Sequence, residues 1–378
     1  MTAADQVAAL LPPRLRQLHG QFRQAMLFRG LFDPSTLLID TVRFPYDRYV
    51  SVGKAAAPTN LSLVIRSHCN ERCVMCHSMH VIEARHPGMS LAELETFIAH
   101  LGPKGKRPGV FLTGGEPFMR RDIIDVVRAF RDGGVQVGVV SNGTLINAER
   151  IKALVELNVA VVVLSLHGSR EVHDRITQRK GSYDAVVESA RALLRARTNT
   201  RVLFNCAITE FNAAHLADVA RVGEEVGVDA VRFEHLNFVT PSELERQRDV
   251  WTTLGDTDAS VGSYVTELAN PQAFVGAVDA LEREAFGVPV FVKPDLSSAE
   301  RQSWYAGSGA SGRHCTYPWR SVFVDAKAAV YPCGFMFFKV GNLLEEPMDA
   351  IWNGERMVRF RREVARGLFP ACTRCCKL

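Results

Sequence analysis

Residues 61–76 read LSLVIRSHCNERCVMC, a short apolar run followed closely by three cysteines. The run Leu61–Ile65 predicts a buried strand. Cys69, Cys73 and Cys76 come directly after it, where a βα barrel or a parallel sheet places its active-site loops. Three thiolates on one loop can hold three irons of a 4Fe-4S cluster and leave the fourth iron open to a substrate or cofactor. The spacing alone also allows a zinc site completed by His68 or His77.

Apolar runs and helical patterns alternate after this segment. The further expected strands are Gly109–Leu112, Val135–Val140, Val159–Leu166, Val202–Ile208 and Ala230–Phe238. The expected helices are a segment that begins at a Ser90/Glu93 capping box, then 121–132, 147–157, 183–197 and 213–226. Such alternation predicts an α/β fold of parallel strands with helical crossovers, either a barrel or an open doubly wound sheet.

The remainder of the chain has a less regular pattern. We expect a polar stretch around Pro241, followed by helical segments near 262–269 and 273–286 and a strand at Val288–Val292. After a linker over Gly307–Gly312, we expect a hairpin of Ser321–Val324 with Ala329–Tyr331 and a helix around Met348–Val364. The last part looks too small to be stable without a metal.

Composition limits the class of protein. The chain has 378 residues, of which 47% are hydrophobic and 23% charged, which is typical of a globular protein and excludes disorder, collagen and coiled coil. A formal net charge of +4 gives no argument for nucleic acid. No apolar stretch suits a membrane span and no signal peptide is evident, so we expect a cytoplasmic protein. Nine cysteines in that compartment favour metal binding over disulfides.

A second motif, Thr113-Gly114-Gly115-Glu116-Pro117, stands at the end of the second expected strand. Its glycines leave backbone groups open to a ligand, and a carboxylate lies beside them, which suits an amine. Alone, this motif would more often be a simple turn. Together, the two motifs resemble the radical S-adenosylmethionine (SAM) superfamily, which pairs this cysteine spacing after the first strand with this glycine motif after the second.

The resemblance implies a partial (β/α)6 radical SAM barrel and a specific cofactor chemistry. Cys69, Cys73 and Cys76 would bind a 4Fe-4S cluster whose free iron is chelated by SAM. Reductive cleavage of SAM then gives methionine and a 5′-deoxyadenosyl radical that takes hydrogen from an unactivated carbon. Further implied SAM contacts are Gly114, Gly115 and Glu116 at the amine, Ser141, Asn142 and Ser165 at the ribose and carboxylate, Met75 at the adenine, and Arg175 or Arg179 at the carboxylate. Either arginine is named because Thr177 occupies a position where the family often has arginine.

Five cysteines lie in the last 64 residues, as Cys315-x17-Cys333 and then Cys372-x2-Cys375-Cys376. Four thiolates can ligate a second 4Fe-4S cluster completely, and a zinc ribbon fits the spacing equally well. The pattern resembles the SPASM and shorter twitch extensions of radical SAM enzymes. The resemblance implies one auxiliary cluster on Cys315, Cys333, Cys372 and Cys375, with Cys376 as a substitute or a spare. Cys206 lies within an expected strand and is interpreted as a buried structural thiol.

The expected division is an N-terminal helical preamble over 1–58, the barrel over 59–295 and a SPASM/twitch-like domain over 296–378. An auxiliary cluster with four protein ligands favours electron transfer and net oxidation. Candidate bases are Glu234, His235 and His167, with His314 and Tyr317 beside the auxiliary cysteines, while Arg232 suits an anionic substrate.

The substrate class is left open by the sequence. Residues 1–58 look too short for a leader-recognition domain, which favours a small-molecule substrate over a peptide. A peptide-modifying enzyme is the first alternative, and a non-catalytic iron–sulfur or zinc scaffold is the second. A reducing partner such as flavodoxin or ferredoxin is also expected.

Overall fold

The computed structural model describes residue 28 and residues 44–48, 50–51, 53–76, 85–307, 309 and 312–378. Most of the predicted N-terminal preamble and His77 therefore lie outside the described residues. Within the described part of the chain, no helix is long and apolar enough to cross a membrane.

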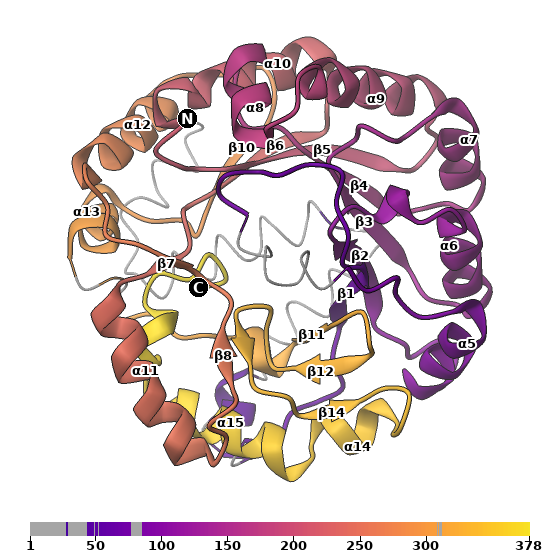
Figure 1. Cartoon of the computed structure of the whole chain (residues 1–378), viewed down its shortest axis with the longest axis vertical. Helices are drawn as coiled ribbons and strands as arrows, with labels where there is room; N and C mark the ends of the chain where they lie inside the picture. The colour runs from indigo at the N-terminus through magenta and orange to yellow at the C-terminus, as the bar shows by residue number, and fades with distance from the viewer. Residues whose placement is uncertain are drawn as a thin grey trace.

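Six parallel strands form the core of the fold and follow one another in chain order across the sheet. They are β1 (Asn60–Arg66), β2 (Gly109–Gly114), β3 (Val137–Ser141), β4 (Val161–Ser165), β5 (Arg201–Ala207) and β6 (Ala230–Glu234). Around them lie α5 (Leu91–His100), α6 (Ile123–Asp132), α7 (Ala148–Glu156), α8 (Arg170–Thr177), α9 (Ser182–Ala196) and α10 (Leu216–Val226), which form an outer ring (Figure 1). The six strands predicted from the alternation are confirmed, and the carboxyl ends of the strands meet at one edge.

Side chains of the strands alternate between the helix side and the barrel interior. The helix side belongs to the large core, which includes Leu61 and Leu63 of β1 and the apolar faces of the surrounding helices. A separate small cluster consists of the strand residues Val161, Val163, Leu203 and Ala230 packed with Phe28. None of the helices around the sheet contributes a side chain to this cluster. We therefore assign this second face of the strands to the barrel interior.

The sheet continues beyond the six strands at both ends. Next to β6 lies parallel β10 (Val290–Lys293), and next to β1 lies parallel β11 (Ser321–Val324), with Asn60 opposite Ser321. Antiparallel β12 (Ala329–Tyr331) and β14 (Gly341–Asn342) complete a ten-stranded sheet. The predicted C-terminal hairpin is confirmed, and it is hydrogen-bonded directly to the strand that precedes the first cysteine loop.

Two expectations for the region after β6 were wrong. The polar stretch around Pro241 is a helix, α11 (Pro241–Leu254), which begins with proline in its first turn and a capping box of Thr240 and Glu243. The predicted helix at 262–269 is absent; β8 (Ser260–Val261) and β9 (Tyr264–Val265) pair instead with β13 (Met336–Phe337) and β7 (Phe238–Val239). These two-residue pairings depend on distant strands, which local periodicity does not reveal.

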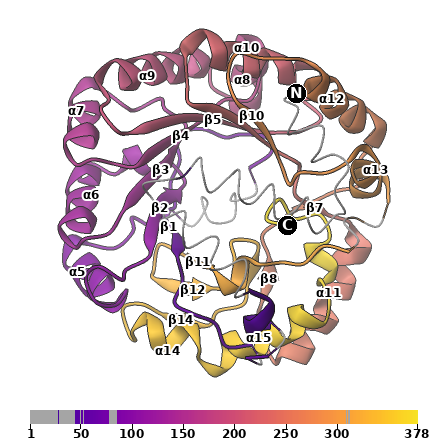
Figure 2. The ribbon, with the colours of Figure 1, turned by 180° about the vertical axis from the view of Figure 1, so that it is seen from behind.

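The C-terminal part closes the ring. The helices α12 (Pro271–Arg283) and α13 (Ser298–Ala306) follow α11, and the helix expected around 348–364 is divided at Asn353–Gly354 into α14 (Met348–Trp352) and α15 (Glu355–Arg366). The short helices η3 (Tyr317–Trp319) and η4 (Pro370–Cys372) lie beside the C-terminal cysteines. Seen from either side, the C-terminus lies inside the ring of elements (Figures 1 and 2).

Candidate active site

Cys69, Cys73 and Cys76 lie together on the loop that follows β1. Burial raises the pKa of the Cys69 thiol to about 11, and the charges of nearby carboxylates and of Cys76 add to the shift. Burial, the carboxylate of Glu71 and the neighbouring thiols raise the pKa of Cys73 as well. All nine cysteines are free thiols. A cation would stabilise such crowded sulfurs as thiolates, and thiolates are the ligands of iron–sulfur clusters, so these residues fit the predicted group.

The glycine motif after β2 packs directly against this cysteine loop. The Gly115 N–H donates to the carbonyl of Arg66 at 2.9 Å, and the Glu116 N–H donates to the carbonyl of His68 at 2.9 Å. A β-carbon at Gly115 would stand 2.1 Å from the His68 carbonyl oxygen. The N–H groups predicted to be open to a ligand are thus used within the chain, and Gly115 is required by the close approach of the two loops.

Glu116 joins the second loop to the third. Its side chain is buried and accepts hydrogen bonds from the Ser141 hydroxyl at 2.8 Å, the Asn142 N–H at 2.8 Å and the Phe118 N–H at 2.9 Å. Burial raises the pKa of Glu116 to about 7, against the effect of these three bonds. In this structure the carboxylate accepts hydrogen bonds from the chain's own donors and thereby holds the loop that contains Ser141 and Asn142.

Asn142 reaches back to the cysteine loop. Its Nδ2 donates to Asn70 Oδ1 at 2.9 Å and lies 4.0 Å from the Cys69 sulfur, while Asn70 Nδ2 donates to Thr144 Oγ1 at 2.8 Å. The Ser141–Thr144 loop is therefore held beside the cysteine loop by the side-chain amides of Asn70 and Asn142, and Asn70 directly follows Cys69, a predicted iron ligand.

The segment from the end of α8 to the start of α9 also contacts the cysteine loop. Glu71 is buried, accepts a hydrogen bond from the Ser182 hydroxyl and accepts another from the Cys73 thiol at 3.7 Å. Arg179 Nη1 donates to the Asn70 carbonyl at 3.3 Å. Arg175 is exposed and donates to the Phe211 carbonyl at 3.2 Å instead. Of the two arginines predicted at the SAM carboxylate, the structure brings only Arg179 to the cysteine loop.

The structure also places two further residues that were predicted to contact SAM, Met75 and Ser165. Met75 is half-buried within the cysteine loop, next to Cys76. Ser165 ends β4 opposite Asn205 of β5 and is also half-buried. Sequence reasoning missed Glu71, although a carboxylate between two cysteines of one loop was a visible signal.

The five C-terminal cysteines also lie close to one another. Burial raises the pKa of Cys315 to about 12, with a contribution from Cys333, and burial raises the pKa of Cys333 to about 11. Burial and the charges of Cys315 and Cys333 raise the pKa of Cys372. Cys375 is hydrogen-bonded to Cys376, which raises the pKa of Cys375 and lowers that of Cys376. This buried set of soft sulfur donors fits an iron–sulfur cluster.

Among the residues that the structure describes, no three cysteine, histidine or carboxylate side chains are arranged as a ready-made site for a single metal ion.

Arg374 fixes the turn that contains Cys372 and Cys375. Its guanidinium forms a buried ion pair with Glu243 of α11, donates from Nε to the Trp304 carbonyl at 2.7 Å, and lies over the Phe238 ring at 4.8 Å. The C-terminal cysteine turn is thereby attached to the elements that follow the barrel.

The candidate bases lie in different environments. Arg232 and Glu234 face the barrel interior, and their Nη2 and Oε1 atoms are 3.5 Å apart. Burial would raise the pKa of Glu234, but the charges of Arg232, Lys377 and Lys293 outweigh it and hold that pKa at about 2. His235 points away, with Nδ1 2.7 Å from the Tyr305 hydroxyl, and burial lowers its pKa.

His167 and Tyr317 are two further candidate bases. His167 is buried and stacks on His173, and this burial lowers its pKa to about 3. Tyr317 is hydrogen-bonded to the side chains of Ser62 and Ser321. Sequence reasoning missed Lys293 and Lys377. Lys293 directly follows the expected strand Val288–Val292 and is the last residue of β10, whereas nothing in the sequence placed Lys377 in the interior.

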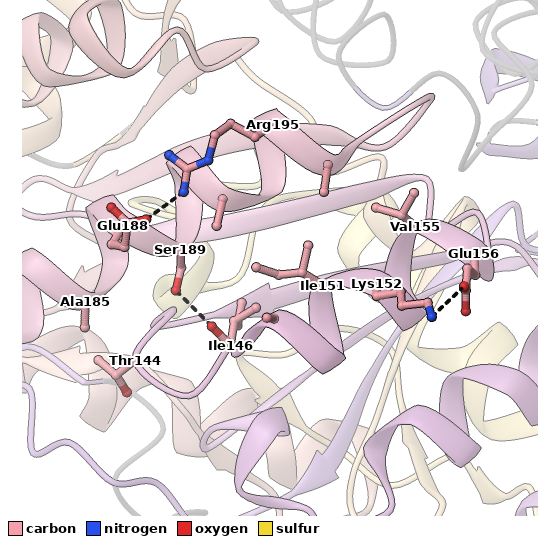
Figure 3. Close-up of a pocket in the computed structure, with 13 residues that line it drawn as sticks. Thr144, Ile146, Ile151, Lys152, Val155, Glu156, Ala185, Glu188, Ser189 and Arg195 are labelled. Carbon is pink, nitrogen blue, oxygen red and sulfur yellow. Dashed lines mark hydrogen bonds and ion pairs between the residues drawn. The ribbon is translucent and has the colours of Figure 1, made fainter.

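Two cavities lie near these loops. One of about 810 Å³ lies between α7 and α9 and has Ile151, Ser189 and Arg195 in its wall (Figure 3). Because its lining comes mostly from helices of the outer ring, we do not assign it to the cofactor. The other, of about 840 Å³, extends from Ser67 and His86, beside the cysteine loop, to Tyr331 and Phe337 of the C-terminal strands.

Comparisons with known proteins match two parts of the chain to known families. Residues 63–222 match the radical SAM superfamily, and residues 315–376 match the SPASM family, an iron–sulfur cluster-binding domain. The chain is 24% identical to an AdoMet-dependent heme synthase of Methanosarcina barkeri (81% of this chain, 85% of the relative) and 24% identical to an Fe-coproporphyrin III synthase of the same organism (92% and 88%).

The fold resembles that of Streptococcus suis SuiB bound to the precursor peptide SuiA, with a TM-score of 0.57, 15% identity and coverage of 87% of this chain and 72% of that one. A radical SAM domain implies a 4Fe-4S cluster and SAM, and a SPASM domain implies auxiliary iron–sulfur clusters, which favours iron over the zinc alternatives and an enzyme over a scaffold. The chain belongs to the radical SAM superfamily, as an enzyme with a C-terminal SPASM domain.

Proposed function

We propose that the protein is a radical SAM oxidoreductase that removes hydrogen from a carbon of a small-molecule substrate and completes the oxidation through one auxiliary 4Fe-4S cluster. When bound, the first cluster and SAM supply the 5′-deoxyadenosyl radical that abstracts hydrogen. In this proposal Cys69, Cys73 and Cys76 hold the first cluster.

One observation carries the proposal: three loops from different strands are hydrogen-bonded to the cysteine loop. The Gly115–Glu116 backbone, the Asn142 side chain and Arg179 each contact the segment Arg66–Asn70. Such preorganisation positions a bound cofactor without further movement of the chain. The loops contain the residues expected at the SAM amine, ribose and carboxylate.

The auxiliary site supports net oxidation. Cys315, Cys333, Cys372 and Cys375 supply four thiols, which would leave no iron open to a substrate. Its role in this proposal is to accept an electron from the substrate radical while a residue of the barrel accepts a proton. A reducing partner such as flavodoxin or ferredoxin would supply the electron that starts each cycle.

The small-molecule assignment is supported by relatives named as AdoMet-dependent heme synthase and Fe-coproporphyrin III synthase, of which this chain spans 85% and 88%. The likeness to the peptide-bound SuiB concerns the fold alone. A tetrapyrrole or a related cofactor precursor is therefore the first substrate class to test, ahead of a peptide.

The test of the catalytic site uses anaerobically reconstituted protein with SAM and dithionite. We expect about eight irons per chain, as two four-iron clusters require, and release of 5′-deoxyadenosine. Cys76→Ala should abolish that release, whereas the matched control Cys206→Ala, in the buried part of β5, should retain it. Release that persists in Cys76→Ala would show the assignment to be wrong.

The auxiliary site is tested by the double variant Cys333→Ala/Cys372→Ala, which should lower iron from about eight to about four per chain. Comparing Cys375→Ala with Cys376→Ala then identifies the fourth ligand, because only one of them should lose iron. Unchanged iron in the double variant would exclude this cluster.

A further inference from the structure

The cavity of about 840 Å³ lies at the carboxyl ends of two neighbouring strands. Its wall includes Ser67, which directly follows β1, and Asp325, which directly follows β11. The two strands are parallel partners in the sheet, so their carboxyl ends meet at the same edge. In barrels of parallel strands, this edge is where substrates bind.

The same cavity borders a segment of each cysteine group. Ser67 stands two residues before Cys69, and its N–H donates to the carbonyl of His86, another residue of the wall, at 3.1 Å. Tyr331 of the wall stands two residues before Cys333. A ligand in this cavity would therefore contact the chain close to a predicted iron ligand of each cluster.

Three aromatic side chains gather at this cavity. Tyr331 and Phe337 line it, and their ring centroids are 5.3 Å apart in an edge-to-face contact. The ring of Phe323 contacts both, at 6.4 Å from Tyr331 and 6.2 Å from Phe337. We call Phe323, Tyr331 and Phe337 the aromatic wall; all three side chains are half-buried. Half-buried rings retain apolar surface that a ligand can cover.

Strand register places two of these rings on the inner side of the sheet. Phe323 of β11 is opposite Ser62 of β1 and opposite Tyr331 of β12, and residues opposite each other point to the same face. Leu61 and Leu63, which flank Ser62, belong to the core on the helix side. Ser62, Phe323 and Tyr331 therefore point to the other side, which is that of the barrel interior. The strands β11 and β12 lie inside the ring of helices (Figures 1 and 2).

Two glycines pack closely against rings of the aromatic wall. A β-carbon at Gly262 would stand 2.5 Å from the Phe337 ring, and a β-carbon at Gly334 would stand 3.1 Å from the Phe323 ring. Larger residues at these positions would displace the rings. The rings are thus held in defined positions before any ligand binds, which lowers the entropic cost of binding.

Charged residues in the wall of the cavity do not favour one sign of ligand charge. Arg356 forms an ion pair with Asp256, and Asp325 accepts a hydrogen bond from the Tyr331 hydroxyl at 3.2 Å. The other carboxylates and ammonium groups of the wall are of both signs: Asp258, Glu345, Glu346, Lys327 and Lys339. The aromatic wall is therefore the feature of the cavity that defines the chemistry of its ligand.

We propose that this cavity binds a planar, conjugated system of several rings, which stacks against the aromatic wall. The volume of about 840 Å³ is near the upper end of the range for small-molecule sites, which suits several rings better than a single one. Contacts between aromatic rings add affinity beyond that of the buried area. A tetrapyrrole is such a ring system. The identification of the ligand as the substrate rests on the proposed function, but its binding does not.

The experiment measures binding to the anaerobically reconstituted holoenzyme by equilibrium dialysis, without reductant. The probes are deuteroporphyrin IX, which is planar, and deuteroporphyrinogen IX, which has the same two propionates but saturated bridges and is not planar.

The variants remove one ring at a time and keep an apolar side chain: Phe323→Leu, Tyr331→Leu and Phe337→Leu. Tyr331→Phe retains the ring and removes only its hydrogen bond to Asp325. Tyr46→Leu is the matched control, because Tyr46 is 58% exposed and does not line the cavity. Iron is measured in each variant to show that the clusters are intact.

We expect one deuteroporphyrin to bind per chain, and each leucine variant to weaken that binding about three- to ten-fold, as expected for the loss of one aromatic contact. Tyr331→Phe and Tyr46→Leu should bind the porphyrin with wild-type affinity. The porphyrinogen should bind at least about ten-fold more weakly than the porphyrin, and the leucine variants should change its affinity less. Structural damage would instead weaken the binding of both probes alike.

The proposal is overturned if deuteroporphyrin does not bind, if the porphyrinogen binds as tightly, or if Tyr46→Leu weakens binding as much as Tyr331→Leu. Failure of the proposed function is visible separately, as absence of 5′-deoxyadenosine when the wild-type enzyme receives SAM and dithionite.

Discussion

The attachment of the C-terminal cysteine turn by Arg374 gives a prediction that separates the two metal sites. The side chains of Arg374 and Glu243 are 4% and 6% exposed, so Arg374→Met leaves a buried carboxylate without its partner. Removing one member of a buried ion pair costs about 3–5 kcal/mol. The carbonyls of Trp304 and Gly307 lose their donor as well.

This cost is concentrated at the turn between Cys372 and Cys375. We expect Arg374→Met to lose the auxiliary cluster, with iron falling from about eight to about four per chain, while release of 5′-deoxyadenosine persists. The midpoint of urea unfolding should fall. Arg366→Met is the control, because Arg366 forms an exposed ion pair with Glu363 and its loss should change stability by about 0.5 kcal/mol or less.

A second variant tests whether the ion pair is the cause. Glu243→Gln retains the capping function of this position in α11 but removes the buried charge. The double variant Arg374→Met/Glu243→Gln should therefore recover stability and iron relative to Arg374→Met alone. Wild-type iron and an unchanged urea midpoint in the single variant would refute the reasoning, as would a double variant no better than the single one.

Two further predictions concern the loops around the first cysteine group. Gly115→Ala should reduce the rate of SAM cleavage about 100-fold, because the added β-carbon would meet the His68 carbonyl and displace the cysteine loop. The control Gly276→Ala has open space at its β-carbon and should cleave SAM at the wild-type rate. Equal rates of SAM cleavage in the two variants would contradict the loop contact. Glu116→Gln should lower the free energy of unfolding by about 1–3 kcal/mol, because the new glutamine NH₂ group would face one of the N–H or O–H donors that now bind the carboxylate. Thermal unfolding measures this loss, and an unchanged Tm would argue against the three hydrogen bonds.

The barrel could be predicted because its signals are local. Each strand from β1 to β6 is a short apolar run between helical patterns, and two cysteine and glycine motifs follow the first two strands. The helix α11 was missed because its sequence is rich in charge, although Thr240, Pro241 and Glu243 form a recognisable start. The pairs β8–β13 and β7–β9 involve only two residues per strand and depend on partners distant in the chain.

The parts of the candidate site that carry a sequence motif could be predicted from the sequence. The structure brings Cys69, Glu116 and Asn142 together, as the order of the motifs suggests. It adds contacts that depend on tertiary structure: Arg179 rather than Arg175 reaches the cysteine loop, and Lys377 returns into the barrel from the end of the chain. These depend on loop paths and on strand register, which no local pattern contains.

The parallel pairing of β1 with β11 has a consequence for how the protein is made. Asn60 and Ser321 are partners in register although 261 residues separate them, so β1 has no neighbour on that side until the ribosome has synthesised β11. Contacts of such large sequence separation form slowly, and an open strand edge is a template for association with other chains. Nascent or truncated chains that end before Ser321 should therefore aggregate through β1, which makes the last sixth of the chain a requirement for solubility during synthesis as well as for metal binding.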